Sequence, residues 1–139
     1  MGLTYADIEL VNADDLALNA RGYLTEDKVK KITVTMLVDS GAYSLAINEN
    51  IKTQLDLRFI EEQVVEMADG SKKRLQVVGP VDVKFQNRST TVRAIVLPGD
   101  VEPLLGAIPM EDMDLWIDPR NQELKVNPDS PLIAKKPLK

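Results

Sequence analysis

Short runs of apolar and β-branched residues, separated by polar turns, make up most of the hydrophobic pattern of this chain. Runs of this kind bounded by Gly, Pro, Asn, Asp or Ser are typical of strands. We therefore predict strands at residues 5–11, 29–38, 45–47, 64–68, 72–78, 81–85, 91–97, 115–117 and 124–126. Helical spacing occurs in short segments, at about 48–55 and 107–113, and the connection at 12–22 is either a turn or a short helix. The pattern predicts an all-β protein with one or two short helices.

The strongest turn signal is Asp69-Gly70, which lies between two of the predicted strands. Asp-Gly flanked by strand residues favours the tight turn of a β-hairpin, because both types tolerate a left-handed backbone. Gly79-Pro80 follows in the second strand. Since proline cannot donate a hydrogen bond to a strand ladder, we expect this pair to end the second arm of the hairpin.

Size and charge restrict the organisation and the partners of the chain. Its 139 residues are most simply one domain at 1–127, followed by a flexible tail at 128–139 that contains Pro and Lys. The net charge is −5 and the basic residues are scattered, so neither nucleic acid nor an anionic membrane is an expected partner. No segment resembles a signal peptide or a membrane span. We expect a cytoplasmic protein.

The chain has no His and no Cys. Catalysis by a Ser-His-Asp or Cys-His system is therefore excluded, as are the usual zinc ligands and thiol redox chemistry. No Gly-rich phosphate loop opens a helix. We expect no metal and no cofactor, and carboxylates remain as the candidate acid and base for a hydrolytic reaction.

Asp39 stands where the apolar strand at 29–38 ends. A carboxylate in this position is partly desolvated, which is unfavourable unless something stabilises it or the chemistry needs it. Ser40 can hydrogen-bond to neighbouring backbone, and Gly41 lets the chain turn sharply. The alternative is that Asp39 caps a turn after the strand and has no further role.

The order of three motifs points to a known family. Asp39-Ser40-Gly41-Ala42, the hairpin at Asp69-Gly70 and Leu104-Leu105-Gly106 follow one another along the chain. This order resembles that of retroviral-type aspartic proteases, and the chain looks like a small single-domain bacterial member of this retropepsin-like family. The resemblance extends over about residues 32–117. It implies a closed acid-protease barrel with a flap hairpin, and hydrolysis of peptide bonds in a peptide or protein substrate.

The resemblance also assigns roles by position. Asp39 matches the catalytic aspartate. Ser40 matches the residue whose hydroxyl reaches across a dimer axis and braces the two aspartates. Gly41 gives the turn and presents its carbonyl to the substrate backbone, and Ala42 is the small residue that follows.

Two further segments match by position. Ala68-Asp69-Gly70-Ser71 matches the flap that closes over the substrate, and Leu104-Leu105-Gly106 matches the structural segment beneath the catalytic loop. This flap is polar, whereas viral flaps are glycine-rich and apolar, so an ordinary exposed turn is the alternative. The chain also continues past residue 118, beyond where viral chains end, so the strands that pair two copies stay open; the strands at 5–11 and 124–126 are the candidates. We expect Trp116 to lie in the core.

Only one Asp-Ser-Gly occurs in the chain. Peptide-bond hydrolysis by an aspartic protease needs two carboxylates that share one proton and hold a water molecule between them. If the chain is a peptidase, a second copy must supply the second Asp39, and a two-fold homodimer does so because residues on its axis meet their own twins.

Three function classes remain open from the sequence. The first is a homodimeric aspartic endopeptidase. The second is a catalytically silent retropepsin-like module for dimerisation or binding, which the polar hairpin would suit. The third is an unrelated β-barrel in which Asp-Ser-Gly is coincidental. The intact motif favours the first, because a silent site has no reason to keep a desolvated carboxylate.

Overall fold

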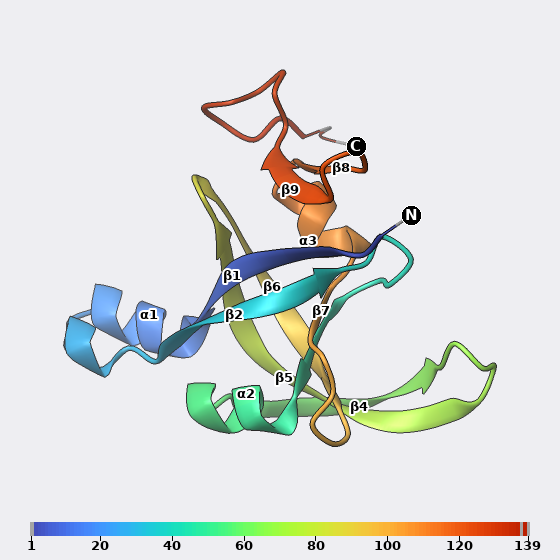
Figure 1. Cartoon of the computed structure of the whole chain (residues 1–139). Helices are drawn as coiled ribbons and strands as arrows, with labels where there is room; N and C mark the ends of the chain where they lie inside the picture. Colours follow the sequence, from blue (N-terminus) through green and yellow to red (C-terminus); the bar gives the residue numbers. More distant parts are fainter. Residues whose placement is uncertain (1, 137, 139) are drawn as a thin grey trace.

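The computed structural model of the chain describes residues 2–136 and 138 (Figure 1). Those residues form mostly strands, with a few short helices. The strands are β1 (Thr4–Asn12), β2 (Lys31–Val38), β3 (Leu45–Asn48), β4 (Phe59–Glu66), β5 (Lys72–Phe85), β6 (Arg88–Leu97), β7 (Leu104–Leu105), β8 (Leu115–Asp118) and β9 (Glu123–Val126). The helices are α1 (Ala13–Ala20), the 3-10 turn η1 (Glu26–Lys28), α2 (Glu49–Leu55) and α3 (Ala107–Asp112).

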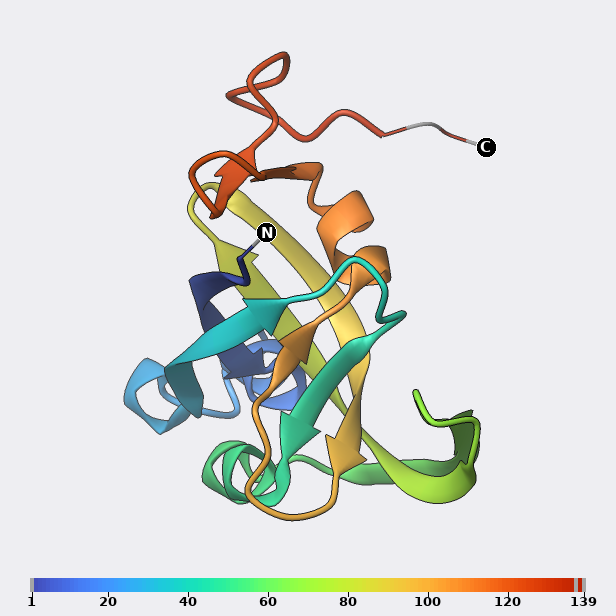
Figure 2. The ribbon, with the colours of Figure 1, turned by 45° about the vertical axis from the view of Figure 1, so that its right-hand side comes forward.

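One sheet closes on itself and forms the body of the molecule. Its strands run in the order β1-β2-β7-β3-β6-β5-β4, and β5 also pairs with β1. β4 pairs with β5 alone, so the β4–β5 hairpin projects from the closed part, as Figure 2 shows. β8 and β9 form a separate two-stranded hairpin beside α3. The predicted all-β retropepsin-like fold with a projecting hairpin is confirmed.

The core lies inside the ring of strands. Ile8, Met36, Leu45, Val83 and Leu105 are fully buried there, each from a different strand. Side chains alternate across a strand, so one face of each strand fills the core and the other meets solvent. Burial of a large aliphatic side chain stabilises a fold by about 1.5–3 kcal/mol. The strands that carry the candidate site are therefore held from within by a shared apolar core.

Gly79-Pro80 does not end a strand, and that prediction is wrong. β5 continues through both residues to Phe85. The register with β6 shifts between Val78 and Val81, which gives the proline a bulge where no ladder bond is needed. The Gly79 N–H donates instead to the carbonyl of Arg58, at 3.0 Å.

α1 forms in the segment where the sequence left a turn or a short helix open. Asn12 caps its first turn, since its side chain accepts a hydrogen bond from the Asp15 N–H at 3.1 Å. The amide of Asn12 also donates to the carbonyl of Leu55, at 2.9 Å. The Asn12 side chain thus links the start of α1 to the end of α2, which local helical spacing does not reveal.

Part of the predicted tail contacts the domain. Asp114 accepts hydrogen bonds from the Ser130 hydroxyl at 2.5 Å and from the Lys135 N–H at 2.9 Å. The Asn87 side chain donates to the carbonyl of Pro131, at 2.9 Å. The boundary at 127 and the flexibility of the tail stay predictions. Among the described residues, no helix is long and apolar enough to cross a membrane.

Candidate active site

Asp39 begins a tight loop, residues 39–44, which we call the Asp39 loop. The Asp39 N–H donates a hydrogen bond to the carbonyl of Leu105 in β7, at 3.0 Å. Its carboxylate accepts from the Gly41 N–H at 2.9 Å, and the Ala42 N–H donates to the Asp39 carbonyl at 3.1 Å. The side chain is half-buried. The apolar strand β2 thus delivers an oriented carboxylate to the surface of the core.

The far end of the Asp39 loop is fastened to α3. The Ala107 N–H donates to the carbonyl of Ala42 at 2.8 Å, and the Ile108 N–H donates to the carbonyl of Tyr43 at 3.0 Å. At Gly106 the two segments approach so closely that an added Cβ would lie 2.8 Å from the Ser44 nitrogen. Leu104-Leu105-Gly106 therefore lies beneath the loop, and no larger residue than glycine fits at the third position.

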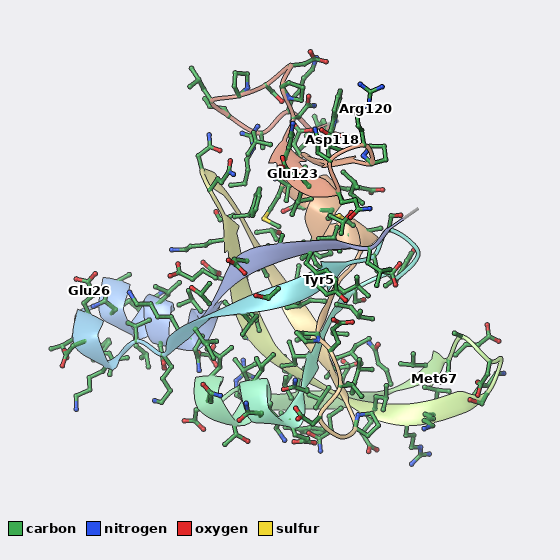
Figure 3. All side chains as sticks on the ribbon, viewed as in Figure 1. Tyr5, Glu26, Met67, Asp118, Arg120 and Glu123 are labelled. Carbon is green, nitrogen blue, oxygen red and sulfur yellow. The ribbon has the colours of Figure 1, made fainter. Side chains whose placement is uncertain are left out.

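A cleft of about 460 Å³ lies between the Asp39 loop and the β4–β5 hairpin. We call it the Asp39 cleft. Asp39 and Gly41 line its loop side, and Val65 and Met67 line its hairpin side. Figure 3 shows Met67 on the projecting hairpin. The rest of the wall comes from β3, β6 and β7 and is apolar: Ala46, Ile95, Leu97 and Leu104. A carboxylate beside an apolar cleft is the arrangement that an extended peptide with apolar side chains would fit.

The tip of the hairpin, residues 67–71, is held by its own hydrogen bonds. The Met67 N–H donates to the carbonyl of Ser71 at 2.7 Å, and the Gly70 N–H donates to the carbonyl of Met67 at 2.9 Å. Gly70 has a φ of 86°, which non-glycine residues rarely adopt. The Ser71 hydroxyl and N–H both donate to the Asp69 carboxylate, at 2.6 and 2.9 Å, and these hydrogen bonds lower the pKa of Asp69.

Comparison with known proteins decides the family. Residues 26–109 match the family of gag-polyprotein putative aspartyl proteases. This segment is more than half of the chain. The chain belongs to that family. No curated protein sequence matches it.

The fold agrees with this aspartyl protease family. The chain is similar to "EIAV protease complexed with the inhibitor HBY-793", with a TM-score of 0.55 and 13% sequence identity. The likeness covers 80% of this chain and 88% of that chain. It shows a shared fold, and the matched family segment contains the Asp39 loop, the hairpin and Leu104-Leu105-Gly106. β8 and β9 lie outside the matched segment.

The motifs identified in the sequence reach the cleft unequally. Asp39, Gly41, Ala42, Ala68 and Leu104 line it. The other predicted residues do not: Ser40, Asp69, Gly70, Ser71, Leu105 and Gly106. Ser40 lines a separate hollow with residues of α3 and β8, and Asp69 to Ser71 form the exposed tip of the hairpin. Their assigned roles stay predictions.

Several cleft residues were not recognised in the sequence. They are Tyr43, Ser44, Ala46, Val65, Glu66, Met67, Ile95 and Leu97. Tyr43 and Ser44 directly follow the motif, so adjacency was an available signal. The others sit on β3, β6 and the hairpin, and only the pairing of β3 with β6 brings Ala46 opposite Ile95.

Trp116 is not a core residue, and that prediction is wrong. Its side chain is 48% exposed in β8. It lines a second, smaller hollow of about 360 Å³ that also includes Ser40. Among the described residues, no group of three or more Asp, Glu, His or Cys side chains is placed to hold a metal ion.

Proposed function

We propose that this chain is an aspartic endopeptidase that works as a homodimer, with Asp39 of each copy in one shared site. The observation that carries the proposal is the position of Asp39. It is a half-buried carboxylate, oriented by hydrogen bonds, at the wall of an apolar cleft beneath a projecting hairpin. Membership of the aspartyl protease family supports the same reading.

The chemistry follows from bringing two such carboxylates together. Two carboxylates at hydrogen-bond distance cannot both ionise, so the pair retains one proton. The ionised member takes a proton from a water molecule that attacks the peptide carbonyl. The protonated member donates its proton to the carbonyl oxygen, and the resulting tetrahedral species breaks at the C–N bond as the amine gains a proton.

The other residues bind and position the substrate. The apolar wall at Ala46, Ile95 and Leu97 accepts an apolar side chain of the peptide. The hairpin residues Val65 and Met67 cover it from the other side. Closure of the hairpin would exclude bulk water, which strengthens the electrostatic interactions at the reacting carbonyl. The Gly41 N–H fixes the orientation of the Asp39 carboxylate through its 2.9 Å hydrogen bond.

The test is Asp39→Asn, measured on a mixed-sequence peptide library with cleavage products read by mass spectrometry. We expect cleavage to fall at least about a thousandfold, because the amide can activate no water. The matched control is Asp27→Asn, an exposed carboxylate in η1, which should cleave like the parent. Parent activity should be bell-shaped in pH, as the pair gains and loses its single proton.

Undiminished cleavage by the Asp39→Asn protein would overturn the proposal. The silent binding module is the second candidate, and the polar tip of the hairpin, with Asp69 and Ser71, favours it. That candidate predicts that the parent binds peptides from the same library and releases them intact.

A further inference from the structure

Residues 127–136, which follow β9, fold back onto the domain, and we call this segment the strap (Figure 1). One carboxylate, that of Asp114, holds the strap at three points. The Ser130 hydroxyl and the Lys135 N–H both donate to its Oδ2 atom, at 2.5 and 2.9 Å. The Asn127 side chain donates to its Oδ1 atom, at 3.0 Å. Both ends of the strap therefore converge on a single side chain in the turn between α3 and β8.

A second carboxylate and a buried guanidinium add to this fastening. The Nζ atom of Lys136 lies 3.2 Å from the carboxylate of Asp112, the last residue of α3, which also accepts a hydrogen bond from the Thr90 hydroxyl in β6. Arg88, at the start of β6, is 3% exposed and donates through Nη2 to the Ser130 carbonyl. Its Nε and Nη1 atoms have no hydrogen-bond partner among the described residues. Because an unpaired buried charge is costly, the strap also stabilises Arg88.

Asp114 has an uncommon backbone conformation. Its φ is 56°, a left-handed value that residues other than glycine seldom adopt. Hydrogen bonds from Ser130, Asn127 and Lys135 lower the pKa of its carboxyl group from 3.8 to about 2. Because this folded-state pKa is depressed, the stabilisation is present above about pH 4 and is lost as the pH falls through about 2. The strap thus stays fastened over the acid range in which two carboxylates that share one proton are expected to work.

The short helix α3 connects the strap to the Asp39 loop. The two carboxylates that bind the strap lie at its C-terminal end. At its N-terminal end, the N–H groups of Ala107 and Ile108 donate to two carbonyls of the loop, at 2.8 and 3.0 Å. α3 has six residues and is about 9 Å long, which is too short for a helix to be stable by itself. Met110 and the adjoining Met113 anchor its buried face in the core, and the strap fixes its exposed end.

We propose that the strap positions the Asp39 loop, and that Asp114 is the positioning residue through which the strap acts. Release of the strap would let α3 tilt, which would weaken its two hydrogen bonds to the loop and the orientation of the Asp39 carboxylate. The apolar wall of the cleft comes from β3, β7 and the far end of β6, so binding of a peptide should change less than its turnover. The effect on cleavage rests on the proposed function, whereas the effect on the loop does not. The strap lies outside the segment matched to the aspartyl protease family.

The first test is Asp114→Asn, followed by amide hydrogen exchange and by cleavage kinetics. Asparagine tolerates a left-handed backbone and is nearly isosteric with aspartate, so the variant should fold, but one amide oxygen cannot replace two carboxylate oxygens. We expect exchange at the amides of Lys135, Ala107 and Ile108 to accelerate about tenfold, with exchange across β5 unchanged. The kcat should fall about fivefold while the KM stays within about twofold of the parent value.

The matched control is Asp118→Asn. The Asp118 carboxylate is also hydrogen-bonded, but its partners are Lys125 at 3.1 Å and Asn121 at 2.9 Å, and neither belongs to the strap. This variant removes the same charge from the neighbouring strand β8. It should leave exchange at Ala107 and Ile108 and the kcat as in the parent.

The strap can also be loosened from its own side, without a change in α3. The double variant Ser130→Ala with Lys136→Ala removes one hydrogen bond to Asp114 and the ion pair with Asp112. It should reproduce the accelerated exchange at Ala107 and the lower kcat. Ser130→Thr keeps the hydroxyl and should behave like the parent, which a mere change in side-chain volume does not predict.

Each outcome decides either this proposal or the proposed function. Faster exchange at Lys135 with unchanged exchange at Ala107 and Ile108 overturns the proposal, because the strap then only covers the surface. Equal acceleration across β5 also overturns it, since the effect is then one of global stability. Unchanged protection of Lys135 in both variants shows that Asp114 does not hold the strap, with the same consequence. A parent that cleaves no peptide contradicts the endopeptidase, while hydrogen exchange still decides whether the strap positions the loop.

Discussion

The Asp39 loop and the tip of the β4–β5 hairpin face the same cleft but are held in opposite ways. The loop is fastened to other elements by backbone hydrogen bonds. The Asp39 N–H donates to the Leu105 carbonyl, and the Ala107 N–H donates to the Ala42 carbonyl. The hydrogen bonds of the tip instead join residues 67–71 to each other. Figure 1 shows the same contrast, with the hairpin extending away from the body that carries the loop.

This difference matches what hydrolysis of a peptide would need from each region. A reacting carboxylate has to stay in place, so its loop is tied to the core. A covering arm has to admit a polymer and release two products, so few contacts hold it to the body. We expect changes in the loop to act on stability, and changes in the hairpin to act on turnover.

The largest effect on stability should come from Gly106→Ala. The added Cβ would lie 2.8 Å from the Ser44 nitrogen, which is backbone and cannot move without displacing the Asp39 loop. We expect the free energy of unfolding to fall by about 3 kcal/mol, measured by urea denaturation. Gly22→Ala is the control, since nothing lies within 4 Å of a Cβ there and only its φ of 81° opposes the change. Equal losses at both positions would contradict a tightly fastened loop.

An intermediate effect is expected from Gly70→Val at the tip. Valine disfavours the φ of 86° found at this position, so the turn should distort. We expect turnover to fall about tenfold, because a distorted hairpin closes poorly over the substrate. The free energy of unfolding should fall by about 1 kcal/mol, because the tip is exposed. Unchanged cleavage kinetics in the folded variant would remove the flap role.

The smallest effect should come from Asp69. Hydrogen bonds from Ser71 lower its pKa below the ordinary value of 3.8. Because the folded-state pKa is depressed, the stabilisation is present above about pH 4 and is lost as the pH falls through the lowered pKa. Hydrogen exchange at the amides of Gly70 and Ser71 should therefore accelerate at acid pH relative to the Asp39 loop. In Asp69→Ala this pH dependence should vanish, with little change in global stability.

The parts of the site that could be predicted from the sequence are those whose structure is set by residues close to them along the chain. The apolar run before Asp39 predicts a strand that ends at the carboxylate, and Asp69-Gly70 predicts the hairpin turn, since turn preferences act within a few residues. The helical segment at about 48–55 was likewise predicted, and the Asn48 side chain caps it by accepting a hydrogen bond from the Ile51 N–H at 2.9 Å. Membership of the family also followed from the order of the motifs.

Only the tertiary structure decided which residues share the cleft and which lie outside the core. Ile95 and Ala46 meet because β3 pairs with β6, and Gly79-Pro80 stays within β5 because a shift in register accommodates the proline. Trp116 is half-exposed because β8 pairs with β9 outside the closed sheet. Strand pairing joins residues far apart in the chain, and hydrophobic periodicity specifies that a strand has a buried face without specifying its neighbour.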